Sequence, residues 1–234
     1  MEKTKVEQID YIATLTGEML IFGLLGKILY QVPEAEWLQS LADKEVFLEF
    51  PFAAEQPDVV KGQAFLKEWT EKHQNGKVGE CLEDITVDHT RLMVGIGTTP
   101  VVPWESVYFS DDHLLFQERT IDVRHWYQRF GLEVINKYHE PDDHIGLELA
   151  FMAHLATLGL TARESGDDKK FRFLLTMQRE FLRKHLILWG PMWCDLLDEY
   201  ARTDFYHGLA LVVKGTLLEI ARILNVKVPK PSKK

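Results

Sequence analysis

The stretch that decides the fold reads His139-Glu140-Pro141-Asp142-Asp143-His144-Ile145-Gly146-Leu147-Glu148-Leu149-Ala150-Phe151-Met152. Pro141 suits the first turn of a helix, where its missing N–H costs nothing, and Asp142 and Asp143 favour the positive end of the helix dipole. The following residues are apolar around most of the helix circumference, as in a helix buried among others. We therefore expect a central helix that begins at Pro141 and ends near Arg163.

Helical spacing of apolar residues recurs along the rest of the chain. The sequence predicts helices over residues 6–30, 34–41, 57–72, 79–94, 120–130, 141–163, 171–188, 192–201 and 205–224. We expect Gly190-Pro191 to separate two of these helices, and residues 95–112, with their Gly, Pro and Asp, to form the longest irregular stretch. No region alternates polar and apolar residues over the length of a sheet strand, so the pattern predicts an all-α fold of about nine helices.

The length of 234 residues, 46% of them hydrophobic, suffices for one large helical domain. A soft boundary near residues 131–139 has apolar helices on both sides, which favours a single unit over residues 1–226. The basic residues 227–234 then form a loose tail.

Composition excludes several classes of function. The 36 acidic and 27 basic side chains give a net charge of −9, which disfavours nucleic acid as a partner and favours a cationic ligand. Cys81 and Cys194 stand alone and no secretory signal pattern opens the chain, which indicates the reducing cytoplasm. The apolar run from Met19 to Tyr30 contains Lys27 and is shorter than the roughly 20 apolar residues of a membrane span, so no span is expected.

Ionisable residues crowd the start of the central helix: Glu140, Asp143, His144 and Glu148. A helical metal-binding protein or enzyme built on this cluster is one alternative, but the chain lacks the Glu-x-x-His pattern of di-iron bundles, so no metal is expected. His144 either forms a structural hydrogen bond with Glu140, Glu148 or a backbone carbonyl, or contributes to an acidic binding face. The nearby carboxylates favour its protonated form unless burial outweighs them.

Other catalytic patterns are incomplete. Ser106 does not lie in Gly-x-Ser-x-Gly, and neither cysteine has activating neighbours. The Gly-Lys pair within residues 23–28 lacks the spacing of a phosphate loop and predicts a packing face, so no nucleotide or other cofactor is expected. The apolar and aromatic residues of the segment 100–109 either fill the core or form one wall of a groove for an apolar peptide.

Three blocks of the sequence together resemble the TorD/DmsD family of cytoplasmic chaperones for molybdenum-containing redox enzymes. The first block is Pro103-Trp104-Glu105-Ser106-Val107-Tyr108, followed by Phe130-Gly131-Leu132. The second, Glu140-Pro141-Asp142-Asp143-His144, is similar to the family signature Glu-Pro-x-Asp-His. The third consists of Phe181-Leu182, His185-Leu186, Trp189-x-Pro191 and Phe205-Tyr206.

The resemblance implies a helical chaperone, not an enzyme, that binds the catalytic subunit of a molybdenum-containing reductase. Binding commonly uses the subunit's twin-arginine signal peptide and lasts until the cofactor is inserted; recognition of the folded client is the other mode. The chaperone is a monomer or a homodimer. Carried over residue by residue, the peptide-binding residues are Leu92, Met93, Pro103, Trp104, Glu105, Ser106, Tyr108, Glu140, Asp143 and His144. Met93 stands where the family usually has an aromatic residue.

A twin-arginine signal joins two basic residues to an apolar stretch, and it therefore requires carboxylates beside an apolar groove. We expect Trp104 and Tyr108 to hold the apolar part of the peptide. The carboxylates of Glu105, Glu140 and Asp143 would then hold the arginines.

Overall fold

The computed structural model describes residues 10–52, 56–94, 101–110, 115–134 and 140–229. Its α-helices are α1 (Tyr11–Tyr30), α2 (Ala35–Asp43), α3 (Pro57–His73), α4 (Leu82–Met93), α5 (Glu105–Phe109), α6 (Glu118–Arg129), α7 (Ile145–Glu164), α8 (Asp168–Lys184), α9 (Leu186–Tyr200) and α10 (Asp204–Ile223). A 3₁₀ turn, η1 (Val78–Glu80), precedes α4. The described ranges contain no β-strand, and their β-structure is limited to one isolated antiparallel bridge between Trp104 and His144. The predicted all-α class is confirmed, with ten α-helices rather than nine.

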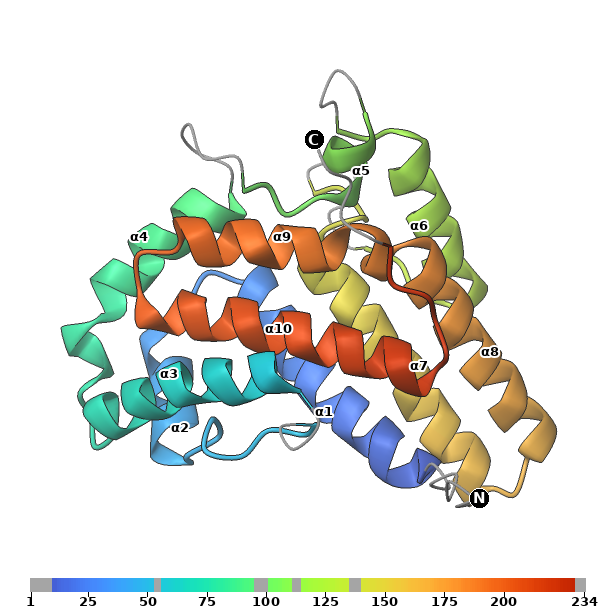
Figure 1. The fold of residues 1–234 in the computed structure, drawn as a ribbon, viewed down its shortest axis with the longest axis horizontal. Helices are drawn as coiled ribbons and strands as arrows, with labels where there is room; N and C mark the ends of the chain where they lie inside the picture. Colours follow the sequence, from blue (N-terminus) through green and yellow to red (C-terminus); the bar gives the residue numbers. More distant parts are fainter. Residues whose placement is uncertain (1–9, 53–55, 95–100, 111–114, 135–139, 230–234) are drawn as a thin grey trace, which may run out of the picture.

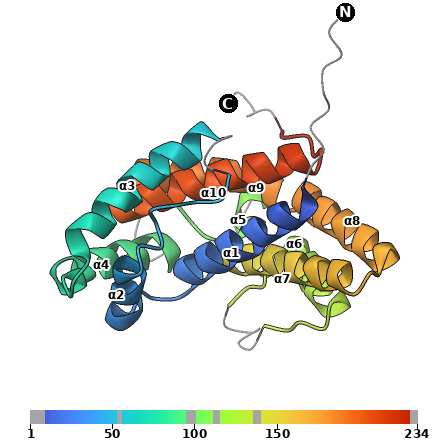
Figure 2. The ribbon, with the colours of Figure 1, turned by 90° about the horizontal axis from the view of Figure 1, so that it is seen from below.

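The helices form two packed layers around one core. Helix α1 lies along α7, while α10 packs against both α3 and α9. Figure 2 shows α1 and α7 on one side of the molecule and α3, α9 and α10 on the other. In Figure 1, α6 and α8 lie at one end of the molecule, and α2 and α4 lie at the opposite end. Large side chains without solvent exposure, including Phe22, Phe47, Trp189, Trp193 and Phe205, fill the space between the layers.

The close approach of α1 and α7 depends on glycine. A Cβ atom added at Gly26 would lie 2.7 Å from the carbonyl oxygen of Gly146, and one added at Gly146 would lie 2.7 Å from the carbonyl oxygen of Gly26. The predicted packing role of residues 23–28 is therefore correct at Gly26. At Gly23, by contrast, the nearest atom to an added Cβ is the Cβ of Ala153, 4.0 Å away.

Helices α1 and α7 are long and apolar enough to cross a membrane, as judged by length and composition alone. The expectation of no membrane span considered only the run from Met19 to Tyr30, whereas α1 already begins at Tyr11. Asp10 caps its first turn by accepting hydrogen bonds from the backbone N–H groups of Ile12 and Ala13. More than half of each apolar window is buried inside the bundle, 56% in α1 and 61% in α7. Core helices of soluble proteins pass the same test.

The central helix α7 begins at Ile145, not at Pro141 as predicted. The backbone before it is engaged elsewhere: Ile145 N donates to the carbonyl of Pro103 at 2.8 Å, and Glu105 N donates to the carbonyl of Asp143 at 3.0 Å. His144 is the N-cap, and its Nδ1 accepts a hydrogen bond from Gly146 N at 3.0 Å. Because of these contacts with a distant segment, α7 begins about one turn later in the chain than predicted.

Two further boundaries differ from the prediction. The stretch expected to be irregular contains the short helix α5, and the break expected at Gly190-Pro191 lies at His185, so that Pro191 stands inside α9. His185 has φ −122° and ψ −96°, outside the helical region, and its ring contacts the carboxylate of Glu105. A tertiary contact therefore sets the position of this break.

Some predictions fall on residues that the structure does not describe. These are the start of the first helix before residue 10, residues 95–100 and 111–112 of the stretch expected to be irregular, part of the soft boundary at 135–139, and residues 230–234 of the basic tail.

Two of the three glycines of α1, Gly23 and Gly26, give a test of the close packing. Gly26→Ala should destabilise the fold by about 1–3 kcal/mol because the new methyl group overlaps the backbone of α7. Gly23→Ala is the matched control, since it has room for the methyl group and should stabilise the helix by roughly 0.5–1 kcal/mol. Urea unfolding of both variants measures the difference, and equal effects would contradict the packing role of Gly26.

A buried carboxylic acid lies between α1 and α8. Glu18 has no solvent exposure, and burial raises its pKa from 4.5 to about 8, an effect that Gln178 on α8 partly offsets. Gln178 is itself buried. Because the folded state holds a proton that the unfolded state releases above pH 4.5, this group weakens the fold as pH rises toward 8.

Glu18→Gln should therefore flatten the dependence of stability on pH. Each unit of difference between the folded and unfolded pKa corresponds to about 1.4 kcal/mol. Between pH 4.5 and pH 8, Glu18 should therefore lower the free energy of unfolding of the unmodified protein by several kcal/mol. Urea unfolding at pH 5 and pH 8 measures both slopes, with the exposed Glu36→Gln as control. Parallel profiles for Glu18→Gln and the unmodified protein would contradict the assignment.

Candidate functional site

Two segments far apart in the sequence meet to form the site. Residues 103–109 and residues 140–148 are joined by the antiparallel bridge between Trp104 and His144 and by the two backbone hydrogen bonds that flank it. The structure thus brings together the first and second blocks of the sequence pattern.

Asp143 fixes the orientation of α5. Its Oδ2 accepts a hydrogen bond of 2.6 Å from the backbone N–H of Ser106, in the first turn of the helix. A carboxylate at a helix N-terminus satisfies a free donor and stabilises the positive end of the dipole. Asp143 has no solvent exposure, so in this structure its role is to cap α5 from another segment.

Glu105 connects α5 to α6 and to the junction between α8 and α9. Its Oε1 accepts a hydrogen bond of 2.6 Å from Arg119 on α6, and its Oε2 lies 2.8 Å from Nδ1 of His185, between α8 and α9. The other ring nitrogen of His185 lies 3.3 Å from Oδ2 of Asp122. Glu105 is completely buried, so its charge is compensated inside the protein.

The neighbouring Asp142 holds α6 against the site. Its Oδ2 accepts two hydrogen bonds from Arg124, at 3.0 Å from Nε and 2.7 Å from Nη2. The hydroxyl of Tyr127 donates to the backbone carbonyl of Asp142 at 3.0 Å. Two arginines of α6 therefore neutralise two buried carboxylates of the site.

Glu148 differs from these carboxylates. It is completely buried, and neither of its oxygens has a hydrogen-bond partner among the described residues. Burial raises its pKa well above 4.5, and the negative charges of Glu105 and Asp143 raise it further, while the nearby indole of Trp189 opposes the rise only in part. These effects favour the neutral, protonated form of Glu148.

His144 is neutral as well. Burial, together with a smaller effect of His89, lowers its pKa from 6.5 to about 3. Of the two outcomes weighed from the sequence, the second holds: burial outweighs the nearby carboxylates and favours the neutral ring. Nδ1 caps α7, and the ring makes edge contacts with Tyr30 and Trp104 at centroid distances of 5.2 and 6.1 Å.

The remaining predicted residues differ in their exposure to solvent. Trp104 is partly exposed and donates a hydrogen bond of 2.6 Å from Nε1 to Oε1 of Glu140, which is also partly exposed. Tyr108 turns inward, where its hydroxyl donates to the carbonyl of Val102 at 2.9 Å. The structure does not bring Leu92 and Met93 to the exposed part of the site, since both are buried at the end of α4.

An apolar groove beside this site was not predicted from the sequence. It has a volume of 480 Å³ and is lined by Tyr30, Tyr127, Leu132, Glu133, Val134, Leu147, Ala150, Phe151 and His154. Four of these residues, Leu147, Ala150, Phe151 and His154, form a stripe along one face of α7. Their spacing is the feature of the sequence that could have indicated the groove. Tyr30 joins the groove to the site, because its ring contacts His144 and the charge of Glu140 helps to raise its pKa.

The Glu105 network should be important for stability. Glu105→Gln removes the charge that compensates Arg119 and contacts His185, and breaking such a buried pair costs on the order of 3 kcal/mol. The exposed Glu118→Gln on α6 is the matched control and should change stability by less than about 0.5 kcal/mol. Urea unfolding compares them, and two equally small effects would contradict the structural role of Glu105.

Comparison with known proteins identifies relatives over most of the chain. The chain is 30% identical over 147 residues to the probable Tat proofreading chaperone DmsD of Haemophilus influenzae, a match that covers 63% of this chain and 65% of the relative. It is 27% identical over 200 residues to the Tat proofreading chaperone DmsD of Salmonella typhi, covering 84% and 85% of the two chains. It is 25% identical over 207 residues to the chaperone protein TorD of Aliivibrio fischeri, covering 88% and 92%.

A protein-family profile described as nitrate reductase delta subunit matches residues 59–195, more than half of the chain. This range contains the bridge between Trp104 and His144 and the buried carboxylates around it. Together with the DmsD and TorD relatives, the match confirms the resemblance inferred from the sequence: the chain belongs to the nitrate reductase delta subunit family, with the TorD/DmsD chaperones as its relatives.

Proposed function

We propose that this chain is a cytoplasmic chaperone, not an enzyme, that binds the catalytic subunit of a molybdenum-containing oxidoreductase. It would recognise the twin-arginine signal peptide of that subunit and hold the client during cofactor insertion and assembly. The names of the DmsD relatives as Tat proofreading chaperones support this class of function. The observation that carries the proposal is an apolar groove with carboxylates beside it.

The groove suits the apolar part of a signal peptide. Its floor is the α7 stripe, and the aromatic rings of Tyr30 and Tyr127 belong to its lining. The small side chain of Ala150 is exposed, which leaves room for a peptide side chain above the helix. Aromatic walls and a helical floor are typical of grooves that bind apolar peptide segments.

Glu140 is the best candidate to bind an arginine. Burial raises its pKa, the hydrogen bond from Trp104 opposes that rise, and no ion pair joins it to a basic residue among the residues that the structure describes. A guanidinium group beside this half-buried carboxylate would stabilise its charged form. Glu133, exposed in the groove lining, adds a second negative charge.

The buried members of the predicted set receive a different role in this proposal. Glu105, Asp143 and His144 hold α5 and the start of α7 in place, so that Trp104 and Glu140 face the peptide. Leu92 and Met93 support the core behind the site. The metal-binding alternative at Glu140, Asp143, His144 and Glu148 is not favoured, because the relatives are named as chaperones.

Calorimetric titration with synthetic twin-arginine signal peptides tests the proposal. We expect saturable binding that weakens when the two arginines are replaced by lysines, since only guanidinium groups pair with carboxylates in a bidentate manner. Glu133→Gln/Glu140→Gln should weaken binding several-fold and reduce its dependence on salt. Ala150→Trp should abolish binding by filling the groove.

Matched controls separate these effects from unfolding. Thr161→Trp places the same bulky group on an exposed position of α7 outside the groove lining, and Glu36→Gln/Glu83→Gln removes two charges from exposed positions of α2 and α4. Both should bind peptide like the unmodified protein. Absence of binding to every signal peptide would overturn this mode and favour recognition of the folded client.

A further inference from the structure

The charges of this acidic protein are separated between its two ends. Helix α8 carries six basic and two acidic residues, whereas α4 carries three acidic residues and one basic residue. Figures 1 and 2 both place α8 at one end of the molecule and α4 towards the other. The molecule therefore has a strong charge asymmetry despite its net charge of −9.

The basic side chains of α8 lie on its solvent side. The helix is amphipathic: Leu174, Gln178, Phe181 and Leu182 are buried against the bundle. On the outside, the α8 face consists of the exposed residues Lys169, Lys170, Arg172, Phe173 and Lys184.

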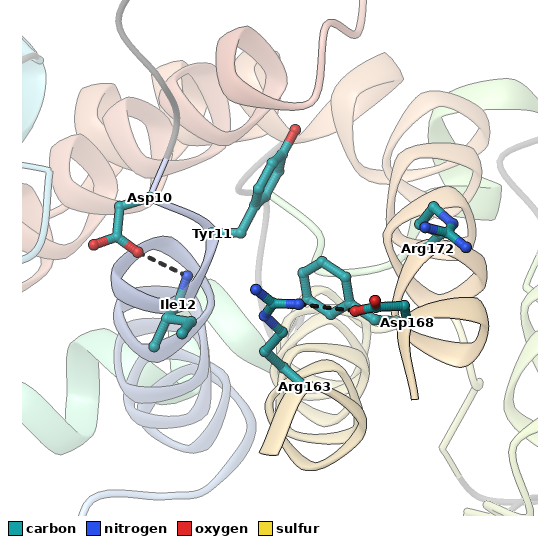
Figure 3. Close-up of a pocket in the computed structure, with 7 residues that line it drawn as sticks. Asp10, Tyr11, Ile12, Arg163, Asp168 and Arg172 are labelled. Carbon is teal, nitrogen blue, oxygen red and sulfur yellow. Dashed lines mark hydrogen bonds and ion pairs between the residues drawn. The ribbon is translucent and has the colours of Figure 1, made fainter. Parts of the chain in front are cut away.

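The acidic residues of α8 do not neutralise this face. Asp168 pairs with Arg163 of α7 at 2.8 Å, and Glu180 pairs with Arg183 at 2.7 Å. Figure 3 shows the Arg163–Asp168 pair beside Arg172, with no interaction drawn to the Arg172 guanidinium. Among the described ion pairs, none includes a basic residue of the α8 face.

The same face exposes an aromatic ring. Phe173 is 48% exposed and lies next to Arg172 in the chain. Exposed aromatic residues among lysines and arginines are typical of protein surfaces that adsorb to anionic membranes, where the ring enters the headgroup region and the cations meet the lipid phosphates.

We propose that the α8 face is a docking surface for an anionic lipid bilayer. The cations spread along a helix of 17 residues rather than around a concave pocket, which suits a planar array of headgroups. The acidic end of the molecule then points away from the membrane. None of the face residues belongs to the lining of the groove, so membrane docking leaves the groove free for a peptide.

Cosedimentation with vesicles tests this surface on the full chain. The protein should bind vesicles of phosphatidylglycerol and phosphatidylcholine in equal parts, and it should not bind phosphatidylcholine alone. Binding should disappear at roughly 1 M salt, where the Debye length is about 3 Å. Lys169→Gln/Lys170→Gln/Arg172→Gln should weaken partitioning about fivefold per charge, or on the order of a hundredfold in total.

Lys61→Gln/Lys67→Gln/Lys72→Gln on α3 is the matched control, with the same loss of charge at three exposed positions. It should retain vesicle binding, and Phe173→Gln should weaken it. Equal losses for the α3 and α8 triple variants, or equal binding to both vesicle types, would overturn the proposal. In another contrary outcome, the protein self-associates without vesicles, in a salt-sensitive manner that the α8 triple variant abolishes. That result would show that the α8 face binds the acidic end of a second copy of the chain.

Discussion

The contact between Asp143 and the first turn of α5 is the constraint on which the site depends. It joins segments 37 residues apart, and its partner atoms, a carboxylate and a backbone N–H, are both buried. Without this contact the N-terminus of α5 would face the core with unsatisfied donors. The bridge between Trp104 and His144 and the capping of α7 by His144 lie next to it, so one short segment sets the start of two helices.

The buried charges around this contact follow a consistent pattern. Glu105 and Asp142 are each neutralised by an arginine of α6, and those arginines are only partly exposed. Glu148 lacks such a partner, and its raised pKa favours the protonated form, which avoids the cost of a buried charge. The acidic cluster seen in the sequence is therefore mainly an internal framework, and Glu140 is its partly exposed member.

The sequence predicted the helical class well because apolar periodicity and Gly or Pro boundaries are local signals. Two helix boundaries were predicted incorrectly, because contacts with distant residues set them. The contact of Ile145 with Pro103 sets the start of α7, and the contact of His185 with Glu105 sets the break after α8. The predicted site residues were mostly adjacent in space, but their burial was not predictable from type alone. The groove was missed because its lining combines α1, α6 and α7 with residues 132–134.

The buried glutamic acids also change the net charge of the whole molecule. A formal count assigns every glutamate a full negative charge and gives −9, yet burial raises the pKa of Glu18 to about 8 and that of Glu148 well above 4.5. At neutral pH the folded protein is therefore less acidic than its composition implies. Unfolding releases the proton of Glu18, so denaturation at neutral pH acidifies an unbuffered solution.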